Sequence, residues 1–244
     1  MGIRGNSGFI GLDLRTGSST GDTKGIVGRK QHFLERTDGR YDPPKIITTG
    51  STQIGNGTTD QEHCPTYGFF NFGWSGIIYT SSEMSVDFTG PKTITDLVFD
   101  YGSLESSGDD DAFDDLRVFC GHYNADTFPS SPDEDIENYV GITDWTQCTN
   151  NGYVWGPKTA GFNYNERITF DTPFEYNGTD RLIIKIEQME GVFTDQPRIL
   201  WKSSTGTASV AYNRLDTYYP TGDGIRTNVK PNIIIHYNMS GNAV

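Results

Sequence analysis

Hydrophobic and polar residues alternate with a period of two through much of the chain after residue 45. The alternation is clearest at residues 93–101, a run that predicts a β-strand, and residues 115–122 predict another. The apolar run at 181–187 predicts the strongest core strand. Further runs rich in Ile, Val, Phe and Tyr lie at 45–49, 51–54, 67–80, 166–170, 174–176, 199–202, 208–212 and 231–237. No amphipathic pattern of helical length stands out, so the sequence predicts strands and turns.

Turn residues such as Gly55-Asn56-Gly57 separate many of these runs at intervals of roughly 8–12 residues, which is typical of sandwiches. We therefore expect an all-β fold, an antiparallel β-sandwich of the jelly-roll type, preceded by an extended N-terminal arm. A sandwich of this length often forms one unit, so residues 46–244 are interpreted as one domain. The last strand, 231–237, is expected to pair with the first, near 45–49.

Residues 1–45 lack the alternation and are rich in Gly and Arg, and Pro43-Pro44 marks the boundary with the body. The arm carries 8 Lys+Arg and 5 Asp+Glu, a net charge of +3. Residues 46–244 carry 11 Lys+Arg and 27 Asp+Glu, a net charge of −16. A basic arm joined to an acidic body indicates that the arm docks onto a partner while the body faces solvent.

The arm has too few apolar residues to fold alone, so we expect it to order on binding. Its basic residues and its few apolar residues are the candidate attachment residues. They are Arg4, Phe9, Ile10, Leu12, Arg15, Arg29 and Arg36.

Composition excludes several classes of partner. The net charge of −13 argues against nucleic acid or an anionic membrane as the main partner. No run of apolar residues is long enough to span a membrane, and the first residues lack the apolar core of a secretory signal. The three cysteines, Cys64, Cys120 and Cys148, form no CxxC pair and are predicted to be free thiols.

An acidic loop is the best metal candidate. Asp109, Asp110, Asp111 and Asp114 lie together beside Gly108, and Ca²⁺ prefers clustered carboxylate oxygens. The spacing of these residues differs from that of an EF-hand. The alternative interpretation is that the carboxylates are exposed to solvent on a loop and bind no metal. We expect no other cofactor.

Aromatic residues are candidates for sugar stacking, because sugar-binding sandwiches place rings against sugar faces. The glycan-stacking candidates are Trp145, Trp155, Tyr218 and Tyr219. The alternative is that these large rings fill the core of the sandwich. The same alternative holds for Trp74 and Trp201. No nucleophile-elbow, HExxH, P-loop or dinucleotide motif occurs, so we expect a protein that is not an enzyme.

The arm resembles the N-terminal segments of virion structural proteins from marine tailed bacteriophages. The resemblance rests on Ser7–Gly11, on Gly25-Ile26-Val27, on Gln31 and Arg36, and on Tyr41-Asp42-Pro43, with Val27 and Tyr41 where those proteins have Trp. It covers under a fifth of the chain and implies attachment to a particle.

The body resembles β-sandwich modules of Bacteroidetes surface proteins over roughly residues 50–202. The matching segments are Ile54–Thr59, the run Tyr67–Met84, Asp115–Phe119, Phe174–Gly178 and Leu182–Ile186. This resemblance implies a jelly roll of adhesive or carbohydrate-binding type with no known catalytic residues.

The sequence thus predicts a non-enzymatic virion structural protein of a tailed phage, assembled in the host cytoplasm. It would be a capsid decoration, a head fibre or a tail component that binds other virion proteins through its arm. Several copies, or a homo-oligomer, would display jelly rolls where they meet a host-surface glycan. The alternatives are a carbohydrate-binding or adhesion module of a bacterial surface and, third, a glycan-cleaving enzyme with an inward carboxylate pair.

Overall fold

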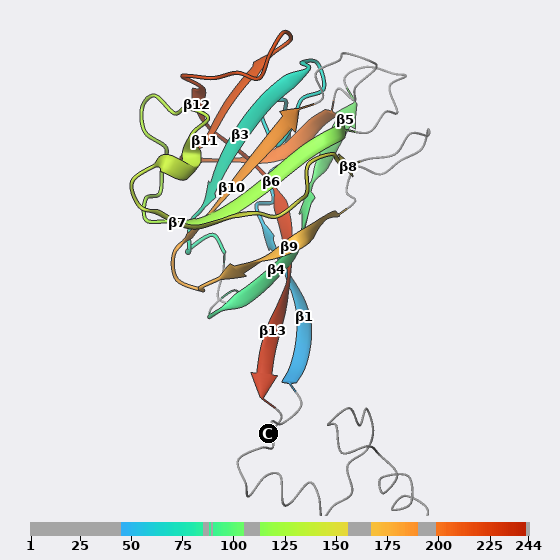
Figure 1. Cartoon of the computed structure of the whole chain (residues 1–244), viewed down its shortest axis with the longest axis vertical. Coiled ribbons are helices and arrows are strands. Elements are labelled where there is room, and N and C mark those ends of the chain that lie inside the picture. Colours follow the sequence, from blue (N-terminus) through green and yellow to red (C-terminus); the bar gives the residue numbers. More distant parts are fainter. Residues whose placement is uncertain are drawn as a thin grey trace, which may run out of the picture. The chain divides into compact units, whose positions relative to one another are not determined.

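The chain folds as strands packed in two antiparallel sheets, seen in a computed structural model that describes residues 45–84, 88, 90–104, 113–155, 167–189 and 199–242 (Figure 1). The strands are β1 (Lys45–Ile54), β2 (Thr59–Gln61), β3 (Phe72–Tyr79), β4 (Lys92–Phe99), β5 (Tyr101–Leu104), β6 (Phe113–Tyr123), β7 (Ile142–Gln147), β8 (Tyr153–Trp155), β9 (Ile168–Tyr176), β10 (Arg181–Met189), β11 (Ile199–Leu215), β12 (Ile225–Pro231) and β13 (Ile233–Asn242). A short 3-10 helix, η2 (Ile136–Asn138), precedes β7. The described residues contain no α-helix, so the all-β prediction is confirmed.

Residues Ile47–Ser240 form one compact unit, and a second unit comprises Met1–Ile46 and Gly241–Val244. Almost all of the second unit lies outside the described residues. The predicted arm and its attachment residues therefore have no structural description, and the account below concerns Ile47–Ser240.

The strand order is that of a jelly roll. One sheet has the order β1-β13-β4-β9, and the other contains the path β12-β11-β3-β10-β6-β7. Counting β1, β3, β4, β6, β7, β9, β10 and β13 as strands one to eight gives the orders 1-8-3-6 and 2-7-4-5. This is the double-sheet arrangement of a jelly roll, and β11 with β12 extends the second sheet beyond β3.

The first and last strands of the body are neighbours, as the sequence predicted. Gly57, just beyond β1, donates its N–H to Asn232 Oδ1 at 3.2 Å, and Gly50 lies against the ring of Tyr237. These contacts show that β1 and β13 run antiparallel. The chain therefore enters and leaves the body on adjacent strands of the four-stranded sheet.

The main core lies between the sheets and is built by alternate side chains. Leu182, Ile184 and Ile186 of β10 are almost fully buried, as are Ile233 and Ile235 of β13. Full burial of one such aliphatic side chain contributes about 1.5–3 kcal/mol of hydrophobic free energy. The alternation in the sequence therefore correctly marked the core faces of these strands.

The three cysteines are buried free thiols, as predicted. Burial raises the pKa of the Cys64 and Cys120 thiols, because the apolar core disfavours the thiolate. The sulfur of Cys148 donates a weak hydrogen bond to the carbonyl of Thr146. These thiols act as small core side chains.

Candidate functional site

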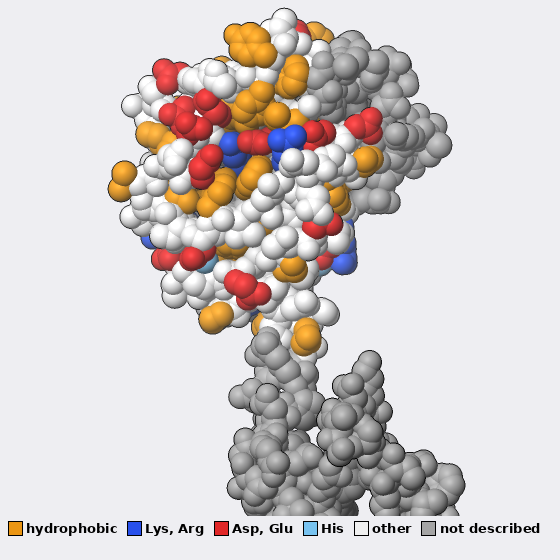
Figure 2. Space-filling view, in the orientation of Figure 1, with side chains coloured by type: hydrophobic (Ala, Val, Ile, Leu, Met, Phe, Trp, Pro, Cys, Tyr) orange, Lys and Arg blue, Asp and Glu red, His pale blue; other side chains and the backbone are white. Residues whose placement is uncertain are grey.

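The outer face of the larger sheet carries a row of charged side chains across β10 and β6. Successive side chains of β6 lie on opposite faces of the sheet, so Leu116 and Val118 enter the core and Arg117 points outward. Glu187 of β10 lies opposite Arg117, and Lys185 lies opposite Phe119. We call Glu137, Lys185, Glu187, Arg117 and Asp115 the charged row. Figure 2 shows basic and acidic side chains alternating across this face, with hydrophobic side chains on both sides of them.

Short polar contacts fix the charged row. Lys185 Nζ lies 2.7 Å from Glu187 Oε1 and 3.8 Å from Glu137 Oε2. Arg117 donates to both carboxylate oxygens of Asp115, at 3.1 and 3.0 Å. The two Arg117 bonds form a bidentate pair, a geometry that holds the guanidinium in one orientation. The pKa of Arg117 is raised, first by the hydrogen bond to Asp115.

Tyr219 is attached to the charged row through its hydroxyl group. It donates a hydrogen bond to Glu187 Oε1 at 3.0 Å. Burial raises the pKa of Tyr219, and the charge of Glu187 raises it further, so the hydroxyl stays protonated at neutral pH. Its neighbour Tyr218 is 59% exposed.

Trp145 reaches the same face from β7. Its ring stacks on Phe119 with centroids 5.9 Å apart and planes 8° apart. It also covers Gly121, where a Cβ atom would lie 2.7 Å from Trp145 Cε3, so only glycine leaves room for the indole. The Lys185 ammonium lies 5.8 Å from the Phe119 ring centroid, within cation–π range. Trp145 therefore borders the charged row.

The structure thus brings two of the four predicted stacking residues, Trp145 and Tyr219, to one face. Trp145 and Tyr219 pack against the same second hydrophobic cluster, and Tyr218 adjoins Tyr219 in the chain. The buried members of this cluster are Trp74, Ile78, Tyr123, Phe128, Ile136, Ile183 and Ala211. Partly covered rings beside fixed hydrogen-bonding groups suit a ligand with both apolar and hydroxyl faces, such as a saccharide.

Trp155, the fourth predicted stacking residue, is a core residue instead. Its ring is 2% exposed and stacks on Trp201, with centroids 5.3 Å apart, and on Phe113, at 5.9 Å. A sugar has no access to a ring covered in this way. Trp74 and Trp201 are also buried, so the core-filling alternative holds for all three tryptophans.

The predicted calcium loop is described only at its end. Asp109, Asp110 and Asp111 lie outside the described residues, and Asp114 is exposed on β6. Among the residues that the structure describes, no three His, Cys, Asp or Glu side chains gather as a metal site. The attachment residues Arg4, Phe9, Ile10, Leu12, Arg15, Arg29 and Arg36 also lie outside the described part of the chain.

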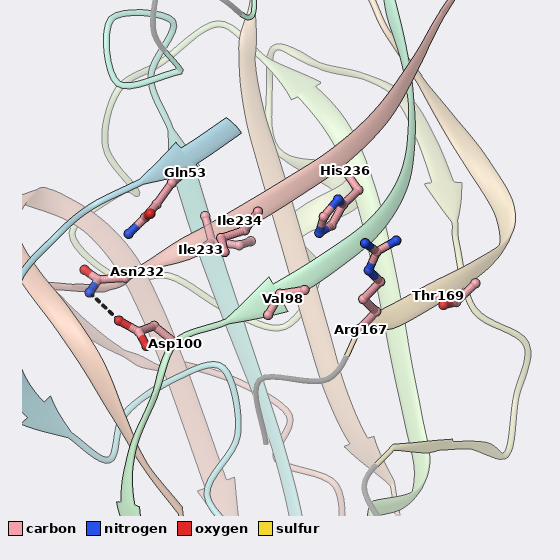
Figure 3. A pocket seen from close by; sticks show the side chains of 9 residues that line it. All are labelled: Gln53, Val98, Asp100, Arg167, Thr169, Asn232, Ile233, Ile234 and His236. Atoms are coloured by element: carbon pink, nitrogen blue, oxygen red, sulfur yellow. Dashed lines mark hydrogen bonds between the residues drawn. The ribbon is translucent and has the colours of Figure 1, made fainter. Parts of the chain in front are cut away.

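A cavity of about 780 Å³ lies on the outer face of the other sheet (Figure 3). It is lined by Gln53, Val98, Asp100, Arg167, Thr169, Asn232, Ile233, Ile234 and His236. This volume is within the range of small-molecule sites, roughly 300–1,000 Å³. An adjoining cavity of about 570 Å³ shares Arg167 and His236.

The free hydrogen-bonding groups of this cavity are mainly cationic or neutral donors. Asp100 accepts from Asn232 Nδ2 at 3.1 Å, whereas Arg167 makes no hydrogen bond or ion pair with any described residue. Burial lowers the pKa of His236, and the charge of Arg167 lowers it further. The neutral imidazole is a second donor, so the cavity suits a polar ligand with an acidic group.

The sequence analysis missed the charged row and the cavity. One usable signal was Lys185, a charged residue inside the strongly apolar run Leu182–Ile186. A lysine in such a run marks the face of the strand that does not enter the core. The cavity had no comparable signal, because its residues come from four strands that are distant in sequence.

Comparisons of the chain with protein-family models, with curated proteins and with solved structures found no match. In the part of the chain that the structure describes, no helix combines the length and apolar character needed to cross a membrane.

Proposed function

We propose that this protein is a non-enzymatic attachment protein of a tailed-phage virion, held by its arm and displaying the jelly roll for binding a surface saccharide. One observation supports the proposal: the strand that follows the predicted arm and the partly exposed stacking candidates belong to different sheets. The chain enters and leaves the body through β1 and β13 of the four-stranded sheet. Two of the predicted stacking residues, Trp145 and Tyr219, pack against the hydrophobic cluster on the outer face of the other sheet.

This division suits display on a particle. The arm precedes β1 directly, so it joins the body at the edge of the four-stranded sheet. The face with Trp145, Tyr219 and the charged row belongs to the other sheet. Several copies on one particle would add avidity to saccharide binding at that face.

Saccharide binding is tested by replacing the exposed ring. Tyr218→Ala is expected to weaken binding to a responsive saccharide on an array of bacterial-surface glycans at least about tenfold, or about 1.4 kcal/mol. Trp145→Ala is expected to act in the same direction. Phe69→Ala is the matched control, because Phe69 is another exposed ring, at 43%, and its ring contacts those of Tyr67 and Phe70. Equal binding by all three variants and the parent protein would contradict the assignment of the site.

A second candidate function is a carbohydrate-binding module of a bacterial surface that uses the cavity of Figure 3. The observation in its favour is the Arg167 guanidinium, which is free of described partners beside a neutral His236. Arg167→Gln in the same array separates the two candidates, with Arg181→Gln as the control for charge. Loss of binding in the Arg167 variant alone would favour this second candidate.

The arm is tested by limited proteolysis of the free protein. If residues 1–45 order only on binding, trypsin is expected to cut first at Arg15, Lys24 and Arg29 and to stop near Lys45. Mass spectrometry of the fragments identifies the order of the cuts. Early cleavage within residues 46–244 while the N-terminal segment stays intact would argue against an attachment arm.

A further inference from the structure

Strand β1 is the edge of the four-stranded sheet. It pairs with β13 on one side, and no described strand pairs with it on the other. Ile47 is 62% exposed, and Thr48, Thr49, Ser51 and Gln53 are also exposed. An edge strand presents unpaired N–H and C=O groups that can pair with another strand.

The other end strands of the two sheet paths, β9, β12 and β7, carry features that block pairing. Strand β9 contains Asp171, Pro173 and Glu175, and β12 contains Pro231 and the exposed Arg226. In β7, Asp144 has a φ of 55°, which breaks the regular extended backbone. Charges, prolines and irregular backbone are the usual means of protecting an edge.

Apart from Lys45 at its first position, strand β1 has none of these protections. Residues Ile46–Ile54 contain no charged residue and no proline. The contrast is marked in a body with 27 acidic and 11 basic residues over 46–244. Two copies of such an acidic body repel each other over most of their surface, and β1 is a strip where this repulsion is weakest.

We infer that β1 pairs with β1 of a second copy of this chain, antiparallel and about a two-fold axis. Two four-stranded sheets would then join into one continuous sheet of eight strands. The strand is suited to pairing with itself. If Gly50 lies at the axis, the exposed Thr49 faces the exposed Ser51, and such a hydroxyl pair is favourable across strands. The interface is isologous, so it closes at a dimer.

Gly50 also allows the strand to stay flat at this point. A Cβ atom there would lie 2.8 Å from the ring of Tyr237, so glycine lets β1 lie close against β13. This inference does not depend on the proposed function, because it rests on the edge of the sheet and not on the saccharide face.

Light scattering after size-exclusion chromatography of the full chain tests the inference. The expected mass at high concentration is twice the chain mass of 27.1 kDa. Thr49→Lys and Ser51→Lys each place like charges near the axis and are expected to raise the dimer dissociation constant at least about tenfold. Thr172→Lys is the matched control, since it makes the same change at an exposed position of β9 and should leave the dimer intact.

Three results would overturn the inference. The first is a monomer at every concentration. The second is a dimer that both β1 variants leave unchanged, which would place the interface elsewhere. The third is a monomer whose β1 amides exchange hydrogen slowly, which would show that the chain's own residues cover the edge. Circular dichroism of each variant confirms that it is folded.

Discussion

Replacing Glu83 with Gln is expected to lower the free energy of unfolding by about 3–5 kcal/mol, because it leaves a buried ammonium without its counter-charge. Lys230 is 4% exposed, and its Nζ lies 2.7 and 2.8 Å from the two carboxylate oxygens of Glu83. Glu83 also accepts hydrogen bonds from the backbone N–H and the hydroxyl of Thr80, both at 2.8 Å. Urea unfolding followed by circular dichroism measures the loss.

Two further variants serve to interpret the stability loss of Glu83→Gln. Glu175→Gln, an exposed carboxylate that accepts from Thr93, is expected to change the unfolding free energy by less than about 0.5 kcal/mol. Adding Lys230→Met to Glu83→Gln is expected to restore much of the lost stability, because it removes the unpaired charge. A Glu83→Gln protein as stable as the parent would show that Lys230 does not depend on this pair.

The effect of Glu83 also depends on pH. Burial alone would raise the pKa of Glu83, but the hydrogen bonds from Lys230 and Thr80 outweigh burial and hold it below 4.5. A carboxyl whose pKa is lower in the folded state stabilises the fold above its unfolded value and loses this contribution as the pH falls. The difference in unfolding free energy between parent and Glu83→Gln is therefore expected to shrink below pH 4.5.

Replacing Trp201 with Ala is expected to cost about 3–5 kcal/mol of unfolding free energy, through a large cavity in the main core. The ring is fully buried, stacks on Trp155 and meets Phe99 edge-on with centroids 6.2 Å apart. Its Nε1 donates to the carbonyl of Thr66 at 2.9 Å, so the substitution also leaves this buried acceptor without its partner.

Trp201→Phe separates the cavity from the hydrogen bond. The phenyl ring refills part of the space but cannot donate to Thr66, so a smaller loss than that of the Ala variant is expected. Both are measured by urea unfolding. An Ala variant with less than about 1 kcal/mol of destabilisation would contradict the placement of Trp201 in a tightly packed core.

Sequence alternation predicted the central strands well because their two faces have different surroundings. Strands β4, β6 and β10 lie where expected, since one face of each enters the core. The two runs at 45–49 and 51–54 form the single strand β1, and those at 199–202 and 208–212 form the single strand β11. Polar residues separate the runs, but the strands continue through them, with a register shift in β11 between Thr205 and Val210.

Pro173 misled the prediction for β9. The sequence indicated two short strands around a proline turn, whereas Ile168–Tyr176 is one strand. Pro173 is tolerated because β9 is an edge strand. It also lies between the paired residues Ile94–Phe174 and Asp96–Thr169, where the pairing of β4 and β9 is irregular. Strands β2, β7, β8 and β12 were missed, because they are short or rich in polar residues.

The candidate site could be predicted only in part. Residue type selected Trp145 and Tyr219, which lie on the outer face, and also Trp155, which lies in the core. The sequence alone does not show which face of a strand a tryptophan occupies. The partners of Lys185 and Glu187 show the second limit. Glu137 comes from η2 and Tyr219 from the segment after β11, and only the fold brings these elements to one face.

The central claim is that the arm anchors the protein while the larger sheet presents its outer face. Electron cryomicroscopy of the particle or complex with which the full chain co-purifies tests it most directly. The account predicts residues 1–45 extended across a neighbouring subunit, with Trp145, Tyr218 and Tyr219 on the face turned away from the particle. Residues 1–45 packed onto their own body, or the charged row buried against the particle, would contradict it.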